Sequence, residues 1–148
     1  MQPDILVFKG LGPRFSEALN IRTLVFVEEQ NVPCELERDE FDAVSSHVLL
    51  TCDGVAVATG RVFSDPECFE TARLGRVAVL KNFRGRGLGR VLIEELLRIV
   101  RSNRQYRRVM IHAQKTVAGL YAGFGFRIVG VEFFEAGILH QEMVLELV

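Results

Sequence analysis

The sequence has few cysteines, almost no net charge and no long apolar run. Its three cysteines, Cys34, Cys52 and Cys68, are odd in number and widely spaced, and no two form a Cys-x-x-Cys pair. This pattern predicts neither a zinc site nor a disulfide framework, so we expect no metal. Reduced thiols are typical of a cytoplasmic protein, which is the location we expect.

The charge and hydropathy patterns exclude several classes of partner. The formal net charge is −1, with 18 Lys and Arg against 19 Asp and Glu, so no bulk field favours a nucleic acid or a membrane surface. No stretch approaches the roughly 20 apolar residues of a membrane span. The first ten residues, MQPDILVFKG, have no basic region before an apolar run, so we expect no signal peptide.

What remains is the composition of a globular protein, with 49% hydrophobic and 25% charged residues. A length of 148 residues suits one domain, which we expect to span residues 1–148, and no repeat, low-complexity tract or linker interrupts it. The charges are unevenly distributed. Residues 28–42 hold seven acids and one base, whereas residues 81–108 hold nine bases and two acids.

Hydrophobic periodicity and turn signals predict an α+β fold with α/β/α layers. We expect a mixed, mostly antiparallel sheet of about seven strands flanked by about four helices. Residues 31–42 and 64–70 are predicted loops, and Asp53-Gly54 is a tight-turn signal. Helices are predicted at residues 14–30, with a break near the β-branched end, 88–102 and 116–122. Strands are predicted at residues 5–8, 46–51, 55–63, 73–80, 107–113, 126–134 and 139–147.

The chain is organised around residues 74–102, LGRVAVLKNFRGRGLGRVLIEELLRIVRS, which combine a strand, a glycine-rich turn and an amphipathic helix. Glycines at alternate positions let the backbone approach a ligand and adopt positive φ. The start of the helix offers free N–H groups and a partial positive charge. Arg84, Arg86 and Arg90 add fixed positive charge. The stretch therefore predicts a phosphate or pyrophosphate site.

Two common phosphate-binding loops do not fit this stretch. A nucleotide P-loop ends in Gly-Lys-Ser/Thr, but Gly89 is followed by Arg90 and Val91. A dinucleotide fingerprint beginning at Gly85 requires its third glycine where Arg90 stands, and this strand lies in the middle of the chain. The pattern that remains is Arg-x-x-Gly-x-Gly, residues 84–89, between a strand and a helix.

This loop resembles the pyrophosphate loop for acetyl-coenzyme A in the GNAT superfamily of N-acetyltransferases. The order of elements is similar to that family, and residues 114–126, QKTVAGLYAGFGF, resemble its short helix ending in Tyr-x-x-x-Gly-Phe. Gln114 departs from the asparagine that the family often has there. Residues 21–42, IRTLVFVEEQNVPCELERDEFD, and 135–143, EAGILHQEM, resemble the small bacterial ElaA-like and YjcF-like subgroup.

The resemblance implies a GNAT-like acyl-CoA acyltransferase fold and direct transfer of an acetyl group to a primary amine. Acetyl-CoA is the implied co-substrate, the acceptor is a small molecule or a peptide, and a homodimer is left open. Main-chain groups of Val77, Ala78 and Val79 would pair with the pantetheine arm, and an N–H there would polarise the thioester oxygen. The pyrophosphate would be bound by residues of the loop, namely Arg84, Gly85, Arg86, Gly87, Leu88, Gly89 and Arg90.

By the same resemblance, Tyr121 is the general acid for the departing thiolate, because a phenol can donate a proton to it. The general base is less clear. Many family members use a carboxylate or a histidine on a central strand, but residues 73–80 contain no acid. His112, at the end of the next strand, and Glu29, in the VFVEEQ segment, are the two candidates.

Three further hypotheses remain open. The missing carboxylate on the central strand favours a non-catalytic acyl-CoA-binding sensor or interaction module, whereas Tyr121 favours an enzyme. An RNA surface along residues 98–108 has Tyr106 as its only aromatic residue, so stacking is weakly supported. The acidic segment 28–42 predicts a negative rim that favours cationic acceptors. An anionic acceptor would instead turn attention to Arg22, Arg73 and Arg76.

Overall fold

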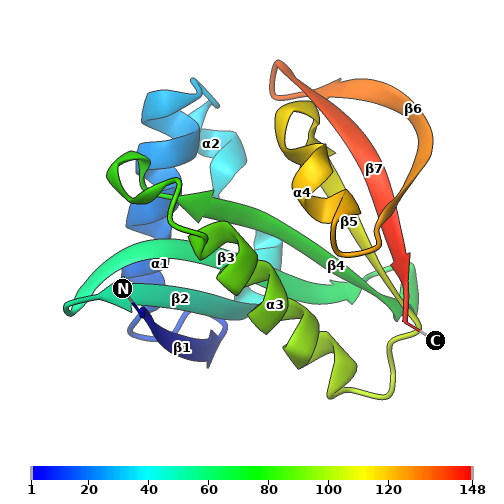
Figure 1. The fold of residues 1–148 in the computed structure, drawn as a ribbon, viewed down its shortest axis with the longest axis horizontal. Helices are drawn as coiled ribbons and strands as arrows, with labels where there is room; N and C mark the ends of the chain where they lie inside the picture. The colour runs from blue at the N-terminus through cyan, green and yellow to red at the C-terminus, as the bar shows by residue number, and fades with distance from the viewer. Residues whose placement is uncertain (1, 148) are drawn as a thin grey trace.

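The computed structural model describes residues 2–147, which form a seven-stranded sheet with helices on both faces (Figure 1). The strand order is β1-β2-β3-β4-β5-β7-β6. Every neighbouring pair is antiparallel except β4 and β5. The predicted mixed, mostly antiparallel sheet is therefore confirmed. The strands are β1 (Asp4–Lys9), β2 (Ser46–Cys52), β3 (Val55–Asp65), β4 (Cys68–Val79), β5 (Arg108–Gln114), β6 (Arg127–Glu135) and β7 (Ile138–Glu146).

The helices lie in two layers, with α1 packed on β3 and β4 from one face and α3 packed on β2, β3 and β4 from the other. The predicted break in the first helix occurs where α1 passes into a π-helical segment, η1. Among residues 2–147, no helix has the length and apolar character needed to cross a membrane. The helical elements are α1 (Phe15–Arg22), η1 (Thr23–Glu29), α2 (Cys34–Glu37), η2 (Glu40–Val44), η3 (Lys81–Phe83), α3 (Leu88–Arg101), η4 (Lys115–Val117) and α4 (Ala118–Ala122).

Two predicted loops are wrong. Residues 31–42 contain α2 and the start of η2, which Asp39 caps by accepting a hydrogen bond from the Phe41 amide at 3.1 Å. Residues 64–70 are mostly strand, because β3 and β4 continue until only two residues separate them. The Asp65 carboxylate closes that turn by accepting from the Glu67 amide at 2.8 Å. Local side-chain hydrogen bonds of this kind leave no periodic hydrophobic pattern in the sequence.

The tight turn at Asp53-Gly54 is confirmed. Asp53 and Gly54 have φ values of 52° and 80° and join β2 to β3. Positive φ at both central residues matches the twist of the flanking strands, which is why two-residue hairpins favour Asp-Gly. Ala136 and Gly137, with φ values of 52° and 77°, make the same kind of turn between β6 and β7.

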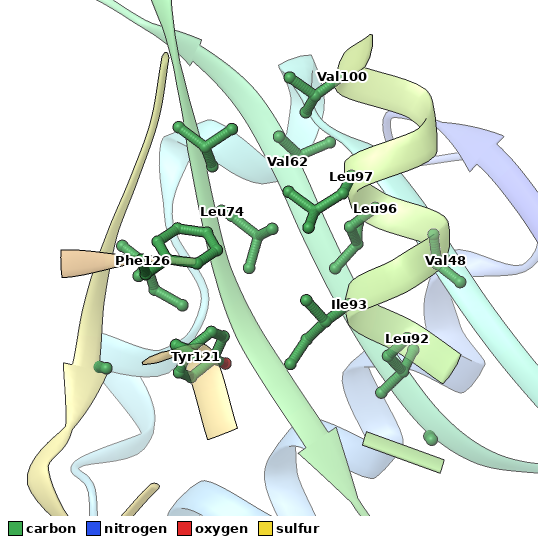
Figure 2. Close-up of a cluster of buried hydrophobic side chains, with 14 of the residues drawn as sticks. Val48, Val62, Leu74, Leu92, Ile93, Leu96, Leu97, Val100, Tyr121 and Phe126 are labelled. Atoms are coloured by element: carbon green, nitrogen blue, oxygen red, sulfur yellow. The ribbon is translucent and has the colours of Figure 1, made fainter. Parts of the chain in front are cut away.

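The sheet separates two hydrophobic cores because successive side chains of a strand point to opposite faces. On β2, Val48 and Leu50 pack with α3, whereas Leu49 packs with α1. Figure 2 shows the larger core, in which Leu96 and its neighbours on α3 face the sheet, and Tyr121 of α4 and Phe126 belong to the same cluster. Tyr121 belongs to this core and also lines a cavity beside it.

Truncation of Leu96 tests how closely α3 packs on the sheet. Leu96 is fully buried, and a Cβ added to Gly60 would lie only 2.8 Å from its Cδ1, so the two fit against each other. We expect Leu96→Ala to lower the free energy of unfolding by about 2–5 kcal/mol through lost burial and a residual cavity. Urea titration followed by circular dichroism measures the change. Leu11→Ala, at an exposed position, is the control and should change stability by no more than about 0.5 kcal/mol.

The parallel contact between β4 and β5 is short. Thr71, Ala72 and Arg73 of β4 are paired with residues of β5, and no pairing follows beyond Arg73 within residues 2–147. The two strands then diverge, as Figure 1 shows. The edge of β4 that contains Val77 and Val79 is therefore left without a strand partner on its β5 side.

Candidate active site

A cavity of about 890 Å³ occupies the region where β4 and β5 diverge. It is lined by residues of η1, α2, β3, β4, β5, α4 and the β6–β7 turn, together with the loop that precedes α3. Most of the residues predicted to bind the donor or to act in catalysis contribute to this lining. They are Val77, Ala78, Val79, Arg84, Gly85, Gly87, Leu88, Gly89, His112 and Tyr121.

The glycine loop leaves open space in front of the N-terminus of α3. Gly85 and Gly87 have φ values of 78° and 79°, and a Cβ at either would meet no protein atom within 4 Å. The first hydrogen bond of α3 runs from the Val91 amide to the Gly87 carbonyl at 3.2 Å. The N–H groups of residues 88–90 therefore have no partner within the helix. Together with the positive end of the helix dipole, they fit a pyrophosphate group.

The three arginines of the loop have different roles. Arg84 donates to the Val79 carbonyl at 2.9 Å and so ties the loop to β4. Arg86 lies over the ring of Phe83 and Arg90 over that of Phe124, and among the described residues neither lines the cavity. Arg86 and Arg90 add positive charge around the loop, but the groups that would contact an anion are the backbone N–H groups.

Glu29 lies at the loop and not in the cavity. Its two carboxylate oxygens accept from Arg84 Nη1 and Nη2 at 2.5 and 2.8 Å. The hydrogen bond from Arg84 lowers the pKa of Glu29. A carboxylate that is paired with a guanidinium and has a lowered pKa is a poor proton acceptor. The structure therefore disfavours Glu29 as the base, and the contact responsible joins residues that are 55 positions apart.

Tyr121 projects from α4 into the wall of the cavity. Its ring is 4% exposed and packs edge-on against Phe126, with centroids 5.8 Å apart. Burial raises the pKa of Tyr121, so the hydroxyl keeps its proton throughout the physiological range and can donate a hydrogen bond.

His112 lies on β5 between two carboxylates that are distant from it in the sequence. Its Nε2 is 3.2 Å from Glu142 Oε1, and its Nδ1 is 3.6 Å from Glu135 Oε1. Glu135 raises the pKa of His112 most and Glu142 adds to that effect, while burial and Arg73 oppose it. The register of β5 and β7, which sets His112 opposite Glu142, creates this group. Only knowledge of that register would have revealed it.

The acidic segment is tied down by a group of charged side chains that we call the α2 ion cluster. Arg22 Nη1 and Arg61 Nη1 both donate to Asp42 Oδ1 at 2.7 Å. Arg61 also binds both oxygens of Asp39, at 2.6 and 2.7 Å. Burial opposes ionisation of Asp42, but the hydrogen bonds and positive charges of Arg22 and Arg61 together outweigh it, so the pKa is lowered. The members are Arg22, Glu37, Asp39, Asp42, Arg61 and Arg76.

The α2 ion cluster corrects the predicted negative rim. It contains three arginines and three carboxylates, so its formal charge is zero. Glu37 and Asp39 are the acids of the segment that line the cavity, and both belong to the cluster. No net negative field from this segment therefore faces the cavity. Within residues 2–147, no group of three or more His, Cys, Asp or Glu side chains could hold a metal ion.

Sequence comparison identifies relatives across most of the chain. Residues 20–147 match the family model described as an acetyltransferase (GNAT) domain. YyaT, an uncharacterised protein of Bacillus subtilis strain 168, is 37% identical over 134 residues, which are 88% of each chain. The N-acetyltransferase YjcF of the same strain is 30% identical over 132 residues, covering 88% of this chain and 91% of YjcF.

Solved structures show the same fold. The crystal structure of Escherichia coli ElaA superimposes with a TM-score of 0.88 at 27% identity, covering 98% of this chain and all of ElaA. A GNAT family acetyltransferase from Elizabethkingia anophelis, solved with acetyl-CoA bound, has a TM-score of 0.70 at 17% identity over 98% of both chains. The second likeness concerns the fold alone.

Proposed function

Since the chain belongs to the GNAT family of acetyltransferases, we propose that it transfers an acetyl group from acetyl-CoA directly to a primary amine of a small-molecule or peptide acceptor. The observation that carries this proposal is one continuous cavity. It joins the glycine loop to the open edge of β4, and it brings Tyr121 and His112 into the same lining. We also propose that residues 1–148 form one domain, because a single sheet contains all seven strands.

Acetyl-CoA supplies the acetyl thioester, and the loop fits its pyrophosphate because Gly85 and Gly87 leave open space where side chains would stand. The unpaired edge of β4 at Val77 and Val79 would bind the extended pantetheine arm by main-chain hydrogen bonds. An N–H on this edge would also donate to the thioester oxygen and stabilise the charge that develops on it.

The two titratable residues of the lining then have opposite tasks. The acceptor nitrogen forms a bond to the carbonyl carbon, and the carbon–sulfur bond breaks. His112 accepts the proton that the amine loses, and Glu135 and Glu142 stabilise the resulting imidazolium. Tyr121 donates its proton to the departing thiolate, which restores a neutral thiol.

Turnover distinguishes this enzyme from a binding module. The purified protein is incubated with acetyl-CoA and a panel of amines, thiol release is followed, and acetylated products are identified by mass spectrometry. Amine-dependent release with a matching product supports the proposal. Tight acetyl-CoA binding without release for any amine would favour the non-catalytic alternative.

The pH dependence of turnover tests His112 as the base. Its pKa is raised above the ordinary value of about 6.5, so the neutral form appears only at higher pH. We expect kcat/KM for the acceptor to rise about tenfold per pH unit below a midpoint that lies above 6.5. Glu135→Gln removes the largest cause of the raised pKa, so the midpoint should move to lower pH.

Glu146→Gln is the matched control, because Glu146 also lies at the β5–β7 edge but pairs with Arg108 and Arg127. It should leave the midpoint in place. A midpoint unchanged by Glu135→Gln would show that another group accepts the proton.

A further inference from the structure

One arginine in the cavity lining is left almost without a partner. Arg73 lies on β4, and its side chain is 30% exposed. Its nearest carboxylate oxygen, on Asp65, is 3.9 Å away, and among residues 2–147 its guanidinium makes no hydrogen bond. A guanidinium carries five N–H donors in a fork that matches a carboxylate. The neighbouring Arg61 and Arg76, by contrast, are neutralised within the α2 ion cluster.

The opposite charge lies close by. Strand register pairs Arg73 with Met110 on β5, and His112 lies two residues further along the same face. His112 is flanked by Glu135, which also lines the cavity, and by Glu142, so its surroundings carry net negative charge when the imidazole is neutral. The cavity thus presents a cationic group and an anionic group on adjacent strands.

An apolar surface completes the region. Phe63 lies opposite Arg73 in the β3–β4 register and stacks on Phe41, with ring centroids 4.4 Å apart and an interplanar angle of 7°. Both rings line the cavity. The guanidinium of Arg61 lies over Phe63, and its Nε is the one buried side-chain nitrogen or oxygen of the described residues that has no hydrogen-bond partner. A polar donor therefore remains free beside these rings.

We propose that the acceptor is an α-amino acid with an apolar side chain, a substrate class that rests on the proposed acetyl transfer. Arg73 binds the carboxylate, the amine lies at His112, and the side chain packs on Phe41 and Phe63. A zwitterion matches the two charged groups, whereas a polyamine would meet the guanidinium of Arg73 with a second positive charge. Arg73 is then a specificity-determining residue.

Binding of product-like probes tests this arrangement without requiring turnover. The CoA-loaded protein is titrated by calorimetry with N-acetyl-L-phenylalanine and with N-acetyl-L-phenylalaninamide, which differ only in the carboxylate. We expect the acid to bind about 10- to 100-fold more tightly, as a charged hydrogen-bonded pair would provide. Arg73→Gln should reduce this ratio to about twofold or less, and Arg73→Lys should retain part of it.

Arg101→Gln is the control, since Arg101 is an exposed residue of α3 and should leave the ratio unchanged. The Arg73 side chain is 30% exposed and its one ion pair is 3.9 Å long, so its variants are expected to fold, which circular dichroism verifies. Equal binding of acid and amide by the unaltered protein would overturn the assignment, as would a ratio that survives Arg73→Gln. A preserved ratio in the unaltered protein together with no turnover of any amine would support the carboxylate site and overturn the transfer reaction.

Discussion

Gly87→Val is expected to abolish acetyl-CoA binding while leaving the fold intact. Gly87 has a φ of 79° at the N-terminus of α3, and a Cβ there would enter the open space in front of the free helical N–H groups. Valine would fill that space and resist the positive φ. Loss of several charge-assisted hydrogen bonds should lower the affinity about 100-fold or more. Calorimetric titration with acetyl-CoA measures the change.

The chain offers a matched control in Gly54→Val. Gly54 has a φ of 80°, and a Cβ added to it would likewise meet no atom within 4 Å, but it lies in the β2–β3 turn and outside the cavity lining. Both variants carry the same backbone strain, on the order of 1–2 kcal/mol. The control should therefore lose stability and keep its affinity. Undiminished binding by a folded Gly87→Val protein would remove the loop from the donor site.

Tyr121→Phe is expected to lower kcat by about 10²- to 10⁴-fold with little change in the affinity for acetyl-CoA. The variant keeps the ring that packs on Phe126 and removes only the hydroxyl. The lost interaction is made chiefly as the thiolate forms, so its loss appears in the transition state. Steady-state kinetics and donor titration together separate the two effects.

The second tyrosine of the chain provides the comparison. The Tyr106 hydroxyl is 2.5 Å from Ser64 Oγ, and Tyr106 does not line the cavity. Tyr106→Phe should reduce stability by about 1 kcal/mol and leave kcat unchanged. If Tyr121→Phe retains a rate within about twofold of the unaltered protein, the hydroxyl serves packing and not proton transfer.

The parts of this molecule that could be predicted from the sequence are those encoded by neighbouring residues. The hydrophobic stripe of α3, the Asp53-Gly54 turn and the glycine loop all follow from local spacing and backbone preference. Local patterns also sufficed for the class of fold, since the order of elements alone limits the sheet to a few arrangements.

The parts that could not be predicted depend on contacts between distant segments. Glu29 was a candidate base from its position in the sequence, and its pairing with Arg84 became visible only with the fold. The same holds for Glu142, which strand register sets beside His112. A charged residue shows its type in the sequence but not its partner, and the partner decides whether its charge is free to act.

The short β4–β5 contact has a consequence for how the protein opens. Three residue pairs join the two strands, and beyond them β4 is paired with β3 only, as at Val79, which lies opposite Ala58. Local opening should therefore begin here, and amide hydrogens along this edge should exchange faster than those of β2 or β3. A donor that hydrogen-bonds this edge completes the sheet as an additional strand would. Binding of the donor would then order this edge of β4, and release of CoA would leave the edge open to local unfolding again.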